Sequence, residues 1–84
     1  MGSYEKIWQK IIDGNSDANI DFEDICKLLQ KIGFEMRVKG SHHIFRMDGV
    51  EERINVQKDG AKAKPYQVRQ IRKVLILNKL KEKL

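Results

Sequence analysis

The sequence predicts an α+β fold in which a three-stranded antiparallel sheet has helices on one face, in the order αα-βββ-α. Two observations support this fold class. Apolar residues recur at helical spacing before residue 33 and again after residue 65, whereas between these segments they alternate with polar residues as they do in strands. Because 84 residues suffice for one hydrophobic core, we expect a single domain over residues 1–84.

Two helices are expected at the start of the chain. The first covers residues 4–13, and Gly14-Asn15 ends it before a polar connector over residues 15–20. Asp21 is expected to cap the second helix, and Gly33 is expected to end it. The apolar stripe of this second helix contains Phe22, Ile25, Cys26, Leu28, Leu29 and Ile32.

Three strands are expected over residues 34–39, 42–47 and 51–57, with turns at Gly40-Ser41 and Asp48-Gly49. Residues 58–64 combine lysines with small residues, which predicts an exposed basic loop. Pro65 then begins the last helix, because a proline at the first helical position loses no hydrogen bond. The apolar stripe of the last helix contains Val68, Ile71, Val74, Leu75 and either Leu77 or Leu80.

Strand alternation assigns the side chains of the sheet to two faces. The residues expected on the core side are Phe34, Met36, Val38, His43, Phe45, Met47, Ile54 and Val56. This register is favoured because the reverse would expose Phe45 and Met47 and would bury Arg46. The residues expected on the open face are Arg37, Lys39, His42, Arg46, Arg53, Asn55 and Gln57. His42 and His43 then point to opposite faces, so we expect no metal site between them.

The composition excludes several classes of protein. Cys26 is the only cysteine, so no internal disulfide forms, and no His/Cys spacing matches a zinc site. No apolar stretch reaches the roughly 20 residues of a membrane span. We therefore expect a cytoplasmic protein without a metal or cofactor, in which Cys26 is a core residue rather than a nucleophile.

The net charge of +5 is unevenly distributed along the chain. Residues 1–36 contain four Lys/Arg against seven Asp/Glu, whereas residues 37–73 contain ten against four. A basic middle after an acidic start predicts that an anionic partner contacts the middle segment. A merely solvated surface is the alternative that charge alone leaves open.

These residues resemble the HicA toxins of type II toxin-antitoxin systems. The resemblance rests on Gly33-Phe34, on the segment Lys39-Gly40-Ser41-His42-His43-Ile44-Phe45, and on the strand and helix that follow. Residues 21–77 would form the family core. Residues 60–69 also resemble a subgroup with an extra N-terminal helix, which residues 1–20 would supply.

The resemblance implies a fold like that of the double-stranded-RNA-binding domain, cleavage of mRNA, and neutralisation by a HicB-type antitoxin that covers the active face. His42, which follows Gly40-Ser41, would be the catalytic acid or base, with the RNA 2'-hydroxyl as nucleophile. The residues expected to contact RNA are Arg37, Lys39, Ser41, Arg46, Lys62 and Lys64.

The residues themselves leave other functions open. His42 could be a turn-flanking histidine without chemistry, and Lys62 and Lys64 could simply solvate a loop. The domain could be a noncatalytic RNA-binding module, or an adaptor whose acidic first helix docks a basic protein. A DNA-binding role is disfavoured because the last helix has no helix-turn-helix partner.

Overall fold

The computed structural model describes residues 3–84 and confirms the α+β class. The helices are α1 (Ser3–Asp13), α2 (Phe22–Ile32) and α3 (Pro65–Leu77), with short 3-10 helices at Asp17–Asn19 and Leu80–Lys83. The strands are β1 (Glu35–Lys39), β2 (His42–Met47), β3 (Val50–Val56), β4 (Lys58–Asp59) and β5 (Lys62–Ala63). Within residues 3–84, no helix is long and apolar enough to cross a membrane.

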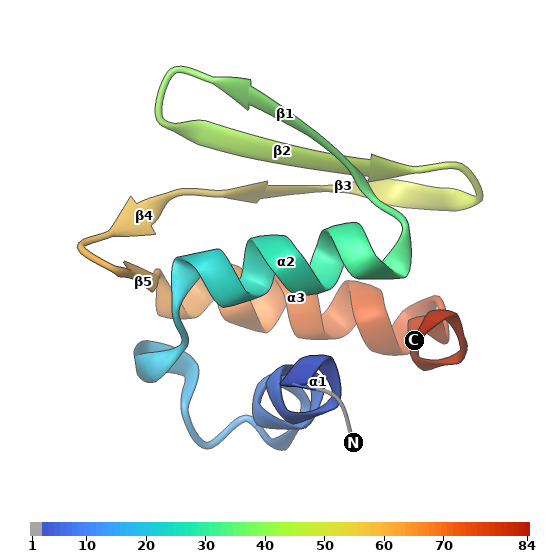
Figure 1. Cartoon of the computed structure of the whole chain (residues 1–84), viewed down its shortest axis with the longest axis horizontal. Coiled ribbons are helices and arrows are strands. Elements are labelled where there is room, and N and C mark those ends of the chain that lie inside the picture. The colour runs from blue at the N-terminus through green and yellow to red at the C-terminus, as the bar shows by residue number, and fades with distance from the viewer. Residues whose placement is uncertain (1–2) are drawn as a thin grey trace.

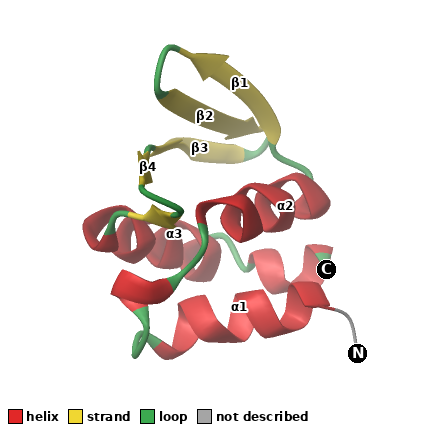
Figure 2. Cartoon of the chain, turned by 60° about the vertical axis from the view of Figure 1, so that its left-hand side comes forward, coloured by secondary structure: helices red, strands yellow, loops and turns green. Residues whose placement is uncertain are grey.

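The elements form three layers (Figure 1). The sheet is the first layer, and α2 and α3 run along one of its faces as the second. α1 crosses the far side of these two helices as the third layer, so it does not reach the sheet (Figure 2). Among the described residues, no helix lies on the opposite face of the sheet, an arrangement compatible with a fold like the double-stranded-RNA-binding domain.

The three long strands form an antiparallel meander in the order β1-β2-β3. Phe45 on β2 lies between Met36 on β1 and Ile54 on β3. Side chains that are opposite each other in register share a face, so this row points toward the helices. The predicted register of β2 is therefore confirmed.

The hydrophobic core lies between the sheet and the helices, where Phe45, Ile54 and Val56 are almost fully buried. α1 adds Trp8 and Ile11 to this core. Burial of these two apolar side chains on one face stabilises α1 as an amphipathic helix. Gly33 ends α2 as predicted, because its φ of 128° suits glycine and its N–H bonds back to the last turn.

Three local expectations differ from the structure, and the choice between Leu77 and Leu80 is settled. Residues 58–64 form the β4–β5 hairpin rather than an open loop. Asp21 precedes α2 but its side chain caps nothing, because it binds Lys62 instead. On the core side of β1, Met36 and Val38 remain exposed, since β1 is the edge strand that lies farthest from the helices (Figure 1). In the last stripe, Leu80 is buried, whereas Leu77 is 70% exposed.

Candidate active site

His42 begins β2 directly after the β1–β2 turn and is exposed on the open face. The turn needs Gly40, whose φ of 63° lies in the left-handed region. In register, Lys39 lies opposite His42 on β1. On β3 the pairing of His43 with Val56 places Gln57 next to His42. The positions on either side of His42 are therefore basic or amide, and neither is acidic.

Asn55 holds the His42 ring. The Nδ1 atom of His42 lies 3.0 Å from the Oδ1 atom of Asn55 on β3. An amide oxygen can only accept, so Nδ1 carries the hydrogen in both the neutral ring and the imidazolium. The Nε2 atom is then left for a substrate, as a proton acceptor when the ring is neutral and as a donor when it is charged. The sequence places Asn55 on this face but does not reveal this contact.

The expected cations of the sheet share the open face with His42. Arg37 lies opposite Ile44, and Arg46 lies opposite Glu35. Both pairs are one residue away from the inward-pointing pair of Met36 and Phe45, so both arginines point to the open face. Arg37, Lys39 and Arg46 are all exposed. Within residues 3–84, none of these three side chains makes a hydrogen bond or ion pair. Their charges are therefore available to an anion on this face.

Ser41 is tied to the sheet through glutamines. Gln57 Nε2 donates to Ser41 Oγ at 3.3 Å, and the Gln57 backbone N–H donates to Gln67 Oε1 at 2.9 Å. Gln67 is a buried polar side chain on α3, so the helix fixes the end of β3 beside the turn. This chain of contacts connects the helix layer to the turn that presents His42, and only the structure reveals it.

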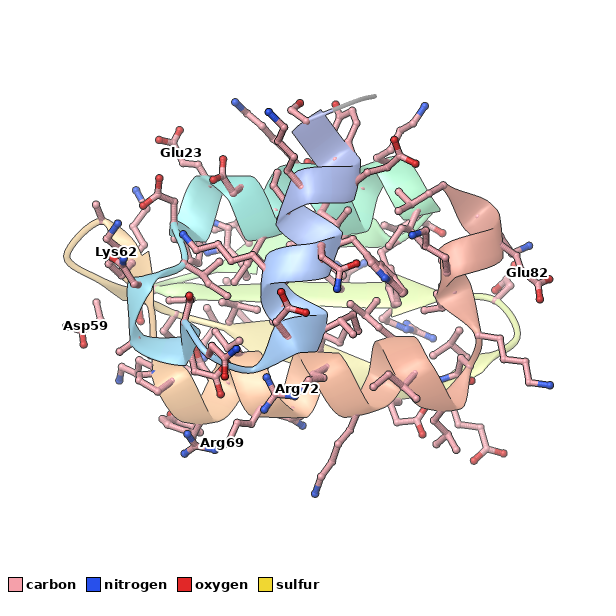
Figure 3. The ribbon with its side chains drawn as sticks, turned by 90° about the horizontal axis from the view of Figure 1, so that it is seen from below. Glu23, Asp59, Lys62, Arg69, Arg72 and Glu82 are labelled. Carbon is pink, nitrogen blue, oxygen red and sulfur yellow. The ribbon has the colours of Figure 1, made fainter. Side chains whose placement is uncertain are left out.

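Lys62 lies on β5 of the β4–β5 hairpin, away from the three-stranded sheet (Figure 3), and Lys64 follows this hairpin. Lys62 Nζ donates to Asp21 Oδ1 at 2.6 Å, and this hydrogen bond and the lysine charge lower the pKa of Asp21 below its ordinary value. Lys64 immediately precedes α3. The structure thus gives Lys62 a structural partner at the start of α2, and it does not group either lysine with the open face.

The segment that contains this site matches a known family. Residues 22–77 match the family model described as HicA toxin of bacterial toxin-antitoxin. The chain belongs to the HicA toxin family. No curated protein and no solved structure matches it.

The HicA match includes α2, every strand and α3, and therefore every residue of the open face. α1 and the 3-10 helix at Leu80–Lys83 lie outside the matched residues. Membership makes the chain a toxin of a bacterial toxin-antitoxin system, which implies an antitoxin partner.

The other histidine of this HicA toxin does not join the site. His43 points to the core side, where its ring meets Phe22 edge to face at 4.7 Å between centroids. Its Nδ1 atom is buried and has no hydrogen-bond partner among the described residues. Within residues 3–84, no three His, Cys, Asp or Glu residues gather in a group that could hold a metal ion.

Cys26 of the toxin is half-buried on α2 against the core. Burial raises the pKa of its thiol to about 11, so the reactive thiolate is scarce at neutral pH. The structure agrees with the prediction that Cys26 is a packing residue rather than a nucleophile.

Proposed function

We propose that this HicA toxin is an endoribonuclease that cleaves mRNA, with His42 as general acid and base. The carrying observation is the exposed His42 ring, whose Nδ1 is held by Asn55 at 3.0 Å while its Nε2 makes no hydrogen bond within residues 3–84. A fixed imidazole with one free nitrogen suits proton transfer near neutral pH. An mRNA substrate places the toxin in the cytoplasm.

RNA supplies its own nucleophile, so the protein has little covalent chemistry to perform. The neutral His42 Nε2 takes the proton of the 2'-hydroxyl as that oxygen attacks the adjacent phosphorus. The bond from phosphorus to the 5'-oxygen breaks, and the imidazolium returns the proton to this oxygen. The products are a 2',3'-cyclic phosphate and a 5'-hydroxyl, and this route requires no metal ion. Proton transfer of this kind contributes about 10²- to 10⁴-fold.

The exposed cations of the open face supply the charge stabilisation. Arg37 and Lys39 lie on β1 beside His42, and Arg46 lies further along β2. Cations placed where negative charge develops stabilise the phosphorane and hold the flanking phosphates. Ser41, Lys62 and Lys64 extend the proposed RNA contacts around the turn and the β4–β5 hairpin.

The proposed protein partner is a HicB-type antitoxin that covers the open face. This face is the part of the sheet that no helix of the toxin covers. An antitoxin seated there would block access to His42 and neutralise the cations, so it would inhibit without altering the fold.

The test is a comparison of the wild type with His42→Ala and with the control Lys73→Ala, an exposed cation on α3. Purified proteins are incubated with a defined mRNA, their folds are compared by circular dichroism, and the product ends are identified. We expect the wild type and Lys73→Ala to release 5'-hydroxyl ends, and His42→Ala to lose at least about 10²-fold in rate. Cleavage that persists in folded His42→Ala would overturn the assignment. RNA binding without cleavage by the wild type would identify a noncatalytic module.

A further inference from the structure

The open face is hollowed at the end of the sheet away from His42. The hollow has a volume of about 590 Å³ and is lined by β1, β2, the β2–β3 turn and β3. This turn lies at the opposite end of the sheet from the β1–β2 turn that presents His42 (Figure 1). Arg37 and Ile44 line the side of the hollow nearer to His42, which is not itself a lining residue.

A β-bulge accounts for this shape. Phe45 pairs with Ile54, but Met47 pairs with Val50, so β3 uses more residues than β2 between the two pairs. Such extra residues bend a strand and increase its local twist. The bend makes the open face concave and turns Glu51 and Arg53 toward it.

Charged side chains of both signs line the hollow, and apart from Glu52, which accepts a hydrogen bond from Asn78, they have no partner among residues 3–84. The charged side chains concerned are Arg37, Arg46, Arg53, Glu35, Asp48 and Glu51. Within residues 3–84, none of them makes a hydrogen bond or an ion pair. The hollow therefore offers both hydrogen-bond donors and carboxylate acceptors to a ligand. The positions beside His42 differ, because they contain no carboxylate.

This mixture suits a nucleobase better than a phosphate. Carboxylates repel phosphate, but they accept hydrogen bonds from the exocyclic amino group of a base, while arginine donates to ring nitrogens and carbonyl oxygens. Ile44, partly exposed at the centre of the face, provides an apolar surface for the ring. Along β2, Ile44 lies about 7 Å and Arg46 about 13 Å from His42, at roughly 3.3 Å per residue.

We infer that the hollow is a base-reading subsite, which binds a nucleotide next to the scissile phosphate and prefers a base with an exocyclic amino group over uracil. This inference rests on the proposed cleavage of RNA. It gives the two ends of the open face different tasks: the His42 end performs the chemistry, and the hollow chooses where along the RNA that chemistry occurs.

The first experiment maps cleavage sites in a randomised RNA. The variants are Glu51→Gln, which keeps the side-chain shape, and Arg53→Gln, which shortens the side chain, and both remove a charge. The matched controls Lys73→Gln and Glu82→Gln lie outside the sheet. We expect the wild type and both controls to disfavour uracil at one position near the cleaved bond. Each hollow variant should reduce that discrimination by about fivefold or more. A wild type without base preference, or hollow variants with an unchanged preference, would overturn the inference.

A binding experiment separates this inference from the proposed catalysis. Affinities of the His42→Ala protein for short RNAs that differ at one base are measured by fluorescence anisotropy, with and without Arg53→Gln. A preference against uracil that Arg53→Gln removes supports the subsite even where no cleavage occurs. Equal affinities for all four bases contradict the subsite, whereas a wild type that binds selectively but never cleaves contradicts only the proposed catalysis.

Discussion

At the residue scale, the candidate chemistry depends on one imidazole and the group that orients it. A surface histidine without a partner samples several rotamers, and only some of them present Nε2 to a substrate. The bond to Asn55 selects one orientation and keeps Nδ1 protonated. In the proposed mechanism Asn55 is therefore a positioning residue, which acts on RNA through His42.

Replacing Asn55 by alanine should slow cleavage without weakening RNA binding. A single hydrogen bond of this kind contributes about 0.5–1.5 kcal/mol, which corresponds to a fall of about 2- to 13-fold in rate. Single-turnover rates and RNA affinities of Asn55→Ala and of the exposed control Gln70→Ala are the measurement. The rate should fall with Asn55→Ala at unchanged affinity, and both quantities should stay unchanged with the control. A loss of affinity at constant rate would show that Asn55 contacts the RNA directly.

Residue-level prediction from the sequence works where it depends on alternation alone. The alternation of side chains along a strand predicted His42 and Arg46 on the open face and His43 against the core. The observed register confirms all three positions. The contact of His42 with Asn55 joins residues on different strands, so it depends on the pairing of β2 with β3. The pairing of Lys62 with Asp21 joins residues that are still further apart in the sequence.

At the element scale, an arginine on α3 fixes the connection between α1 and α2. Arg72 donates from Nη1 and Nη2 to the two carboxylate oxygens of Asp17 at 2.9 and 3.2 Å, and from Nη1 to the Ile11 carbonyl at 3.0 Å. The hydrogen bonds to Asp17 raise the pKa of Arg72 above its ordinary value, so it stays charged. Arg72 and Asp17 are 55 residues apart in the sequence, so only the structure reveals this pair.

Arg72→Met should destabilise the protein, because it leaves Asp17 without its partner in a partly buried site. We expect a loss of about 1–3 kcal/mol in the free energy of unfolding, the range for hydrogen bonds to charged groups. The control is Arg69→Met on the same helix, which removes a cation that points into solvent (Figure 3). Urea denaturation measures both variants. Equal stability of the two variants would show that the contacts of Arg72 with Asp17 and Ile11 contribute nothing to the free energy of unfolding.

Element boundaries were predictable where a strong signal ends the element. Gly33 and Pro65 mark the end of α2 and the start of α3, and both positions are confirmed. The β4–β5 hairpin was missed because strands of two residues give no alternation to detect. The exposure of Met36 and Val38 was also missed, since a strand pattern does not say whether helices extend far enough to cover it.

At the scale of the whole molecule, the uneven charge of the chain is distributed over particular elements of the fold. The acidic segment, residues 1–36, builds α1, the first 3-10 helix and α2, on the side away from the open face. The basic segment, residues 37–73, builds the sheet and α3. Residues 35–57, which form the three long strands, contain four Lys/Arg and four Asp/Glu, so the basic excess lies in the β4–β5 hairpin and α3. On the sheet, the positions beside His42 are Lys39 and Gln57, so that end of the open face lacks carboxylates.

α1 contributes to stability rather than to the open face. Its Trp8 is 6% exposed beneath α2 and α3, and Lys81 Nζ lies 5.7 Å from the centre of the ring. Replacing a buried tryptophan by alanine costs about 3–5 kcal/mol, whereas a domain of this size has roughly 4–13 kcal/mol of stability in total. Trp8→Ala should therefore lose much of its stability, although the molecules that remain folded should keep their cleavage rate.

The matched control for this change is Lys6→Ala, an exposed residue on the same helix, which should alter stability by no more than about 0.5 kcal/mol. Trp8 is the only tryptophan, so unfolding must be followed by circular dichroism rather than by intrinsic fluorescence. A Trp8→Ala protein as stable as Lys6→Ala would mean that α1 is an appendage to the fold. A stable Trp8→Ala protein that no longer cleaves RNA would instead assign α1 to the active surface, against its position on the far side of the helices.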